Sequence, residues 1–540
     1  MVLVYIAGLF VTLFENDSAQ FAVMAMRMVQ ENDFVSLFKG SEEYLDKPHL
    51  HYWLAALSFK LFGLHDWAYR IPGFLLILLG SYSCFGLGRL LYNTDIGKLA
   101  ALVFLTAQTI VLAGIDVRTD AVLTGFTIFA IWQLAAYIEN RSFVHILLGA
   151  LSAGLAFSTK GQIAIVVIGL PILCHLLYTR KWNAFLSWKV LIGLIVFVLA
   201  ITPVLYAYYL QFDLHPEKVI RGSSNRSGIF FILWEQSFER LSGEGVGKNS
   251  SDYFFFFHTF LWVFLPWTFI AIAAYLSRAK TFIKMRFAYN PRYEFLTLGG
   301  ITLVFLLISF AQFKLPHYLN ILIPLYAILS ASYLYSLYRF VKWKQIKVIL
   351  GVQYFILSLV FIATMLLCFS VFKFENTFSY VSLFILFGAI TYFCLKREAY
   401  YLRIITLSVY SSILLNAVLN THFYPQLLNY QGGSSMAKIV AEHHIPVNNI
   451  CKLSDQHTWA LDFYNRKPLM ISSIANLRNK EGDAWVYVTD DQLQELRNLG
   501  FDWDKQYTVD QFRITRLQLK FLDPVSRKKV LRKMHLIHVY

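Results

Sequence analysis

An acidic residue and a lysine lie in two polar segments that follow the first apolar stretch of the chain. The first segment is Glu15-Asn16-Asp17, and the second is Tyr44-Leu45-Asp46-Lys47-Pro48-His49-Leu50-His51-Tyr52-Trp53. A carboxylate at the end of a membrane-spanning helix can take a proton from a hydroxyl group, and a nearby ammonium group can hold a phosphate. Asp17 and Lys47 therefore indicate chemistry on a lipid-phosphate substrate.

More acids and cations lie at the ends of other apolar segments. If these groups converge, they form a site with two carboxylates and several cations. Such a site suits glycosyl transfer from a polyprenyl phosphate, because a carboxylate activates the acceptor hydroxyl and cations stabilise the departing phosphate. The groups are Asp116, Arg118 and Asp120 in one short turn, Lys160 in Ser158-Thr159-Lys160-Gly161, and Lys314 in Gln312-Phe313-Lys314-Leu315-Pro316-His317-Tyr318.

Each candidate residue also has a purely structural interpretation. A charged residue at a helix end can simply be solvated, which fits Asp116 best, and Glu15-Asn16-Asp17 can cap the helix that follows. Four histidines show no close-spaced metal-ligand motif, so we interpret them as hydrogen-bonded or interfacial. They are His49, His51, His258 and His317.

The composition is that of a polytopic membrane protein. Of the 540 residues, 57% are hydrophobic and 17% aromatic, and the mean hydropathy is +0.52, which is more apolar surface than a soluble globular protein could bury. Apolar windows long enough to cross a bilayer as helices predict about thirteen spans. They lie near residues 2–14, 70–91, 97–115, 121–138, 143–159, 161–178, 190–210, 253–276, 295–311, 317–339, 347–372, 376–395 and 402–420. The first is short for a membrane crossing, so we expect that neighbouring helices stabilise it or that the true start lies upstream of Met1.

The net charge of +15 does not indicate nucleic acid, because the basic residues cluster in alternate short loops. This positive-inside bias places those loops in the cytoplasm. The loops that carry Asp17 and Lys47, and the chain after residue 420, then lie outside. The five scattered cysteines imply no disulfide framework. The basic clusters are Arg180, Lys181 and Lys189; Arg278, Lys280, Lys284, Arg286 and Arg292; Arg339, Lys342, Lys344 and Lys347; and Lys396, Arg397 and Arg403.

The polar regions divide the chain into two predicted domains. Residues 1–425 form a transmembrane domain with outer loops at 15–69 and 211–252, and residues 430–540 form a small extracytoplasmic α/β domain. Within 16–67, helical spacing of apolar residues predicts two amphipathic helices on the outer leaflet. In the C-terminal domain, residues 449–453, 484–489 and 511–516 are expected to be strands, and 457–465 and 490–499 helices. No nucleotide-binding motif is present, which argues against a nucleotide-sugar or ATP-driven mechanism.

Five motifs occur in a fixed order between residues 14 and 330. They are Asp17-Ser18-Ala19-Gln20-Phe21, the segment Tyr44 to Trp53, Thr119-Asp120, Gly154-Leu155-Ala156-Phe157-Ser158-Thr159-Lys160-Gly161, and Lys314-Leu315-Pro316-His317-Tyr318. In order and spacing they resemble motifs of the C-type (GT-C) membrane glycosyltransferases. The resemblance is closest to the branch that holds the bacterial aminoarabinose transferases of lipid A and relatives of the protein O-mannosyltransferases.

The resemblance implies a helical membrane bundle with juxtamembrane helices and an extracytoplasmic α/β domain. It makes Asp17 the carboxylate that activates the acceptor, Asp120 the second acid, and Lys47 with Arg240 the groups that hold the phosphate. The chain departs from the family at Gln20, where relatives have Arg, at Asp46, where Glu is usual, and at Gln236, where a His is often found; these changes bear on substrate and metal more than on the reaction. Further candidates are Lys160 and Arg118 for the phosphate, and Tyr44, Asp46, Tyr52, Glu235, Lys314 and Tyr318 for substrate.

We therefore predict an inverting glycosyltransferase in the inner (plasma) membrane, with its catalytic face periplasmic. Its donor would be a polyprenyl-phosphate-linked hexose or pentose, and its acceptor a lipid A-like glycolipid, another envelope glycan or a protein. The sequence identifies no cofactor with certainty and leaves a divalent metal ion open. Two alternatives remain: a transporter or flippase for lipid-linked sugars, which would favour internal repeats and charged, interrupted helices, and an envelope glycan polymerase or ligase that uses the same donor class.

Overall fold

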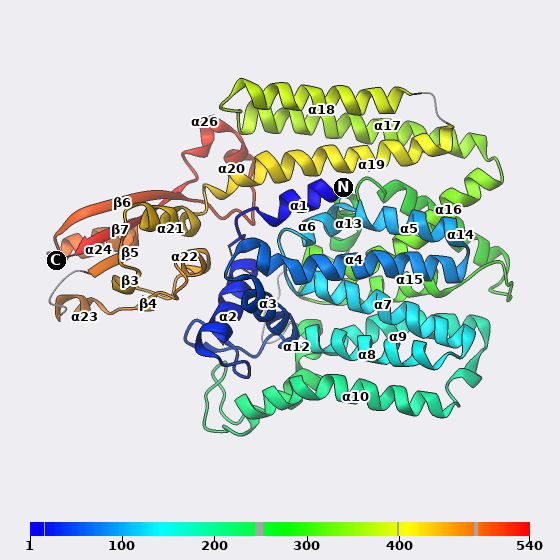
Figure 1. The fold of residues 1–540 in the computed structure, drawn as a ribbon, viewed down its shortest axis with the longest axis horizontal. Helices are drawn as coiled ribbons and strands as arrows, with labels where there is room; N and C mark the ends of the chain where they lie inside the picture. Colours follow the sequence, from blue (N-terminus) through cyan, green and yellow to red (C-terminus); the bar gives the residue numbers. More distant parts are fainter. Residues whose placement is uncertain (16, 244–251, 397–398, 480–483, 540) are drawn as a thin grey trace.

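A bundle of long apolar helices makes up most of the molecule, and a five-stranded sheet with short helices forms its C-terminal part (Figure 1). The predicted class, a helical membrane bundle followed by a small α/β region, is confirmed. The computed structural model describes residues 1–15, 17–243, 252–396, 399–479 and 484–539, without the side chains of Arg240, Leu241 and Asn479.

Within these ranges, nine helical segments are long and apolar enough to cross a membrane. Helix α15 (Leu296–Phe310) is apolar but shorter. The nine segments are Asp66–Leu91 (α4), Thr119–Asn140 (α7), Phe143–Lys160 (α8), Gln162–Thr179 (α9), Trp188–Asp213 with α10 (Trp188–Tyr208), Pro316–Arg339 with α16 (Ile323–Arg339), Trp343–Val371 with α17 (Trp343–Leu366), Thr377–Leu395 (α18), and Tyr400–Leu428 with α19 (Tyr400–Val418) and α20 (Tyr424–Leu428).

Besides the span at 295–311, which is the shorter helix α15, three of the thirteen expected spans are not continuous long helices. The first apolar segment holds only α1 (Val2–Leu9), and the segment 97–115 is divided into α5 (Thr94–Leu105) and α6 (Gln108–Ala113). The segment 253–276 is divided into α13 (Phe255–Val263) and α14 (Thr268–Lys284). Pro266 lies at the second break, where it supplies no backbone N–H for a helical hydrogen bond. The two breaks meet, because the N–H of Gln108 donates to the carbonyl of Leu265 at 2.9 Å.

Helix α7 is the most enclosed of the nine segments. In its most apolar window 83% of the residues are buried, with α4, α8 and α9 packed around it. Gly125 permits the close approach of α4, since a Cβ atom there would lie 2.4 Å from the carbonyl oxygen of Leu76. The packing of α7 therefore fixes the position of Asp120, which lies in its first turn.

Two further helices, as the apolar spacing predicts, lie between the bundle and the sheet domain: α2 (Asp17–Glu31) and α3 (Leu50–Phe62). A short hairpin joins them, formed by β1 (Phe38–Lys39) and β2 (Glu42–Glu43). Helix α2 packs against α3 on one side and against α22 (Trp459–Tyr464) of the sheet domain on the other. The hairpin and α2 thus bring distant parts of the chain to the same end of the bundle.

The C-terminal sheet has the strand order β4-β3-β5-β7-β6. Strand β3 (Ile450–Lys452) is parallel to β4 (Met470–Ile471) and to β5 (Ala484–Thr489). Strand β7 (Arg532–Val539) is antiparallel to both β5 and β6 (Trp503–Gln511). The short helices are α21 (Gly432–Glu442), α22, α23 (Ile474–Asn479), α24 (Asp490–Asn498), α25 (Leu519–Leu522) and α26 (Pro524–Arg527).

The strands expected at 449–453 and 484–489 are present as β3 and β5, but the strand expected at 511–516 is wrong. The chain forms β6 before that segment and β7 after it. Strand β6 lies at the edge of the sheet and is mostly solvent-exposed, so its sequence has many charged and polar residues and a weak apolar signal.

The sheet domain is attached to the bundle beside Asp17. The side chain of Gln431 accepts a hydrogen bond from the N–H of Glu15 at 2.6 Å and donates one to the carbonyl of Leu13 at 2.9 Å. The Glu15 carboxylate accepts the N–H of Ala460 at 3.2 Å, in the first turn of α22. Burial raises the pKa of Glu15 to about 8, so near neutral pH this carboxyl group is largely protonated.

Candidate active site

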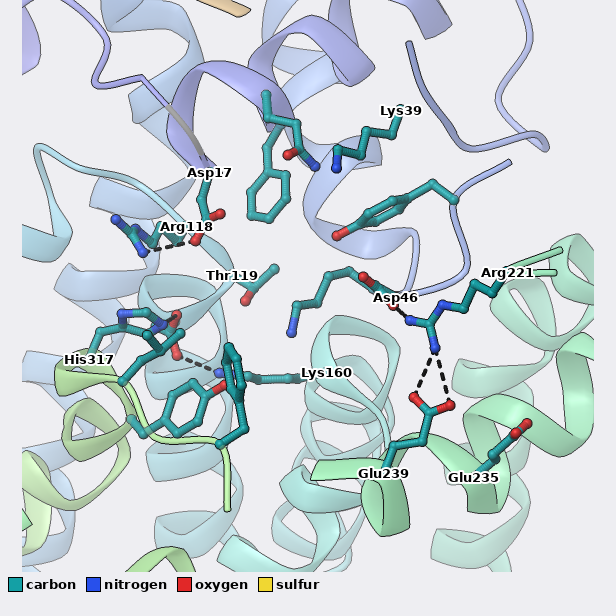
Figure 2. A pocket seen from close by; sticks show the side chains of 18 of the residues that line it. Asp17, Lys39, Asp46, Arg118, Thr119, Lys160, Arg221, Glu235, Glu239 and His317 are labelled. Atoms are coloured by element: carbon teal, nitrogen blue, oxygen red, sulfur yellow. Dashed lines mark hydrogen bonds and ion pairs between the residues drawn. The ribbon is translucent and has the colours of Figure 1, made fainter. Parts of the chain in front are cut away.

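A cavity of about 810 Å³ lies at the end of the bundle nearest α2 and the β1–β2 hairpin. We call it the polar cavity, because eleven charged side chains line it (Figure 2). They come from α2, the hairpin region, the ends of α7 and α8, and the segment from the loop after α10 to α12. These elements are far apart in the sequence and meet only in the folded protein. The acids of the polar cavity are Asp17, Asp46, Asp120, Glu235 and Glu239, and its bases are Lys39, Lys47, Arg118, Lys160, Arg221 and Arg226.

One side of the polar cavity, the helix-end wall, consists of Asp17, Arg118, Asp120, Lys160 and His317. Asp17 begins α2, and its Oδ2 atom accepts a hydrogen bond from Nη1 of Arg118 at 2.8 Å. The Nη2 and Nε atoms of Arg118 both bond Asp116, at 2.8 and 3.1 Å. Burial alone would lower the pKa of Arg118, but the carboxylates of Asp116 and Asp17 raise it above its ordinary value. Arg118 therefore holds two acids and stays charged.

The second pair of the helix-end wall uses the dipoles of two helices. Asp120 lies in the first turn of α7 and Lys160 in the last turn of α8, the ends at which a negative and a positive charge are stabilised. The Nζ atom of Lys160 is 2.6 Å from Oδ1 of Asp120 and 4.6 Å from the ring centre of Tyr318. Nε2 of His317 lies 3.5 Å from the other Asp120 oxygen. The Asp120 side chain is only 4% exposed.

The opposite side, the loop wall, consists of Asp46, Arg221, Arg226, Glu235 and Glu239. Arg221 pairs with Asp46 and also donates to both oxygens of Glu239, at 2.8 and 3.2 Å. Nη2 of Arg226 is 2.5 Å from Glu235 and 3.1 Å from Glu239. This network ties the segment after α10 to α12 (Gln236–Ser242) and to the hairpin region. Figure 2 shows the two walls on opposite sides of the cavity.

Lys47 also lines the polar cavity, and the backbone of the two residues before it is held by hydrogen bonds. Tyr208 donates a hydrogen bond to the carbonyl of Leu45 at 3.0 Å, and Gln236 donates one to the carbonyl of Asp46 at 2.6 Å. Gln236 also packs against Gly161, whose positive φ of 74° and lack of a Cβ allow this approach; a Cβ there would lie 2.4 Å from Oε1 of Gln236. The end of α8, α12 and the Lys47 segment thus form one packed unit.

A second cavity of about 250 Å³, which we call the apolar groove, adjoins the polar cavity. Apart from the residues that it shares with the polar cavity, its lining is mostly aliphatic and comes from α7, α9, α12, the end of α15 and the segment 316–322. Val166 in this lining is 37% exposed and belongs to the spanning helix α9. The two cavities share Lys47, Asp120, Lys160, Phe238, Phe313 and Tyr318.

Most of the residues singled out from the sequence line the polar cavity, but Tyr52 and Lys314 do not. Tyr52 is fully buried and packs edge-on against Phe21 and Tyr44. Lys314 is also buried, and its Nζ atom donates to the carbonyl of Asp252 at 2.7 Å. The side chain of Arg240 lies outside the part that the structure describes. The cavity does contain Asp17, Tyr44, Asp46, Lys47, Arg118, Asp120, Lys160, Glu235 and Tyr318.

Sequence reasoning gave no role to several residues that the cavity contains. Arg221, Arg226 and Glu239 belong to the long loop, where only Glu235 and Arg240 were chosen. The helical spacing of Glu235 and Glu239 after two arginines was a usable signal, because residues four apart share a helix face. Lys39, Gln20 and His317 also line the cavity, although they were not chosen as site residues.

The histidines of the second motif are structural. Nε2 of His49 lies 2.7 Å from the carbonyl of Val35, and Nε2 of His51 lies 3.1 Å from the hydroxyl of Tyr69. Burial lowers the pKa of both to about 4, so both rings are neutral near pH 7. Among the described residues, no group of three His, Cys, Asp or Glu side chains could hold a metal ion.

Comparison with known proteins agrees with this architecture. Residues 46–206 match the family model described as dolichyl-phosphate-mannose-protein mannosyltransferase. The chain is 25% identical over 342 residues to an undecaprenyl phosphate-alpha-4-amino-4-deoxy-L-arabinose arabinosyl transferase of Proteus mirabilis, covering 62% of this chain and 58% of that protein. A second such enzyme, from Edwardsiella ictaluri, is 24% identical over 60% of this chain and 56% of its own length. The chain thus aligns with less than two thirds of these relatives.

The similarity of fold extends over nearly the whole chain. The crystal structure of ArnT from Cupriavidus metallidurans bound to undecaprenyl phosphate superimposes with a TM-score of 0.74 and 17% identity, covering 99% of this chain and 96% of that one. The same enzyme in the apo state gives a TM-score of 0.73. The chain therefore has the fold of a GT-C polytopic membrane glycosyltransferase of the aminoarabinose transferase type.

Proposed function

We propose that this GT-C protein transfers a sugar from a polyprenyl-phosphate donor to an acceptor hydroxyl, with inversion at the anomeric carbon. The observation that carries the proposal is the junction of the two cavities at Lys47, Lys160 and Tyr318. A lipid-linked sugar needs a polar chamber for its sugar and phosphate and an apolar channel for its chain. Here the chamber and the channel share lysines at the point where a phosphate would sit.

The charge balance of the polar cavity supports an anionic ligand. Six basic and five acidic side chains line it. Lys160, Arg118, Arg221 and Arg226 each pair with a carboxylate, and Lys47 and Lys39 add further positive charge. A phosphate at the junction would meet Lys47 and the Lys160 ammonium group in surroundings of low dielectric, where charge-assisted hydrogen bonds are strong.

Asp17 is the better candidate for the general base. Its side chain is 40% exposed, whereas Asp120 is 4% exposed and paired with Lys160. The Asp17 carboxylate takes the proton of the acceptor hydroxyl, the acceptor oxygen bonds to the anomeric carbon, and the bond from that carbon to the phosphate oxygen breaks. Polyprenyl phosphate leaves with the electron pair, and Lys47 stabilises its charge. We assign Arg118 to holding Asp17 in position instead of to the phosphate.

The proposal also includes the side of the membrane that the site faces and the identity of the donor. Basic residues such as Arg141 and Arg180 lie at the ends of α7 and α9 that are distant from Asp120 and Lys160. By the positive-inside rule, these residues support an extracytoplasmic position for the polar cavity. Because the relatives' names specify undecaprenyl phosphate and 4-amino-4-deoxy-L-arabinose, that donor is the first to test, with envelope glycolipids as first acceptors.

The test is turnover of a radiolabelled undecaprenyl-phosphate sugar by the purified protein. We expect sugar transfer to depend on an acceptor and to release undecaprenyl phosphate. Asp17→Asn should lower turnover at least about a hundredfold, as expected for a general base, while donor binding and folding persist. Lys47→Ala should weaken donor binding instead.

Asp95→Asn is the matched control, because Asp95 is an exposed acid in the first turn of another helix. Undiminished transfer by Asp17→Asn would remove Asp17 from the mechanism. Movement of the donor across a vesicle membrane without cleavage would contradict the transferase proposal and indicate a flippase.

A further inference from the structure

A third cavity, of about 310 Å³, lies at a different place, between the bundle and the sheet domain. Its walls come from the end of α1, the turn between α3 and α4, and the end of α22. None of its lining residues lines the polar cavity or the apolar groove. The lining consists of Phe10, Leu64, His65, Asp66, Trp67, Phe463, Tyr464 and Arg466.

The walls of this cavity are held in place by specific contacts. The hydroxyl of Tyr464 donates to Asp66 at 3.1 Å and accepts the N–H of Leu13 at 2.8 Å. The rings of His65 and Trp67 stack with centres 5.7 Å apart and an interplanar angle of 7°. Three distant parts of the chain therefore form one shaped site.

The charges of the cavity leave one cation available. Asp66 interacts with the buried guanidinium of Arg70 and with Tyr464, so its negative charge is compensated. Arg466 follows α22 and is exposed, and within the described residues its guanidinium has no ion pair. A guanidinium group with free donors favours a phosphate, which it can bind with two parallel hydrogen bonds.

The surfaces beside the cavity are apolar and open. Helix α1 exposes Leu3 by 80% and Phe10 by 65%, and α3 exposes Leu57 by 55% and Leu61 by 67%. The cavity also adjoins Asp66, the first residue of the spanning helix α4. Trp67 is an aromatic residue at that level, where such residues mark the boundary between headgroups and hydrocarbon. This third cavity has polar lining residues and apolar flanks at a membrane boundary, and these features match an amphiphilic ligand.

We propose that this cavity binds one membrane phospholipid. Its phosphodiester accepts hydrogen bonds from Arg466, its headgroup lies against His65 and Trp67, and its acyl chains follow the exposed faces of α1 and α3. Because Arg466 belongs to the sheet domain and Trp67 to the bundle, the lipid holds the two parts together. This proposal does not depend on the glycosyl-transfer chemistry.

Native mass spectrometry of the full-length protein, purified in mild detergent, tests the proposal. We expect one bound phospholipid to survive, and both phosphatidylglycerol and phosphatidylethanolamine to rebind, because they share the phosphodiester. Arg466→Glu should lower phospholipid retention at least about tenfold, whereas Arg466→Lys should retain part of it. Arg497→Glu is the control, since Arg497 lies on α24 of the same domain, away from the cavity.

Binding of undecaprenyl phosphate serves as the measure of folding, because that site is separate. It should be unchanged in Arg466→Glu, and a single cooperative thermal transition would confirm that the variant is folded. Equal phospholipid retention in the wild type and Arg466→Glu would overturn the proposal, and so would an equal loss in Arg497→Glu.

Discussion

The two walls of the polar cavity hold their charges in different ways. The helix-end wall takes Asp120 and Lys160 from the ends of packed helices, where the helix dipoles favour each charge. The loop wall takes Arg221 from a segment with little regular structure and Glu239 from α12, and its charges are held mainly by one another. We infer that the first wall is preorganised for chemistry and that the second wall keeps a loop closed over the substrate.

The largest expected effect is on the helix-end wall. Asp120→Asn leaves the Lys160 ammonium group without its partner in a buried site, where breaking an ion pair costs about 3–5 kcal/mol. We expect turnover to fall by about a thousandfold, and the thermal transition in detergent to fall as well. Asp95→Asn again supplies the control. Near-normal turnover by Asp120→Asn would mean that this wall tolerates a lost charge and is not preorganised around it.

A smaller effect is expected from the loop wall. Arg221→Ala removes the side chain that joins Asp46 to Glu239, so α12 should detach more readily. Donor affinity should fall about tenfold, equivalent to about 1.4 kcal/mol, with faster proteolysis between residues 211 and 243 and little change in the thermal transition. Arg292→Ala, at an exposed position, should change neither quantity. A large loss of overall stability would show that the two walls do not differ.

The apolar groove should respond to the length of the donor chain. Val166→Phe narrows the groove, so affinity for a long polyprenyl donor should fall about fivefold, equivalent to about 1 kcal/mol. A donor whose chain is too short to reach Val166 should be unaffected. Val198→Phe, on the exposed side of α10, is the control. Equal weakening for both donors would separate the groove from donor binding.

The smallest effect concerns the attachment of the sheet domain beside Asp17. The pKa of Glu15 is raised to about 8 and that of Asp462, on α22, to about 6, in both cases chiefly by burial. A carboxyl group with a raised pKa binds its proton more tightly in the folded state. Stability should therefore fall as the pH rises through the range between the ordinary carboxyl pKa and about 8.

Thermal transitions of the full-length protein between about pH 5.5 and 8.5 measure this dependence. Glu15→Gln should flatten it in part, since Asp462 remains, whereas Glu442→Gln, at an exposed position on α21, should not. An identical pH dependence in the wild type and Glu15→Gln would contradict the buried position of Glu15.

The sequence predicted features contained in short windows, such as spanning helices and charged helix ends. It did not predict which distant residues contact one another. Apolar length predicts most of the spanning helices, and the motifs indicate charged residues at helix ends, because both signals are contained in short windows. The breaks near Thr106 and Pro266 depend on each other, since Trp267 donates a hydrogen bond to Thr106 at 2.8 Å. A window around either residue alone does not contain that contact.

The loop wall shows the same limit more clearly. Arg221 pairs with Asp46, which lies far away in the sequence, and Arg118 pairs with Asp17. Both arginines are basic residues near a polar motif, so the sequence alone does not show that each of them holds a carboxylate. Their pairing follows from the packing of helices, which residue spacing does not report.

The most direct test of the central claim is to locate the bound donor. Undecaprenyl phosphate with a photoreactive diazirine in its first isoprene units would be cross-linked to the purified protein and the adducts mapped by mass spectrometry. We expect adducts within 162–166 and 307–321, which line the apolar groove, and competition by unlabelled undecaprenyl phosphate. Adducts only on the lipid-facing surfaces of α10, α17 or α18, with none in the groove, would contradict the account.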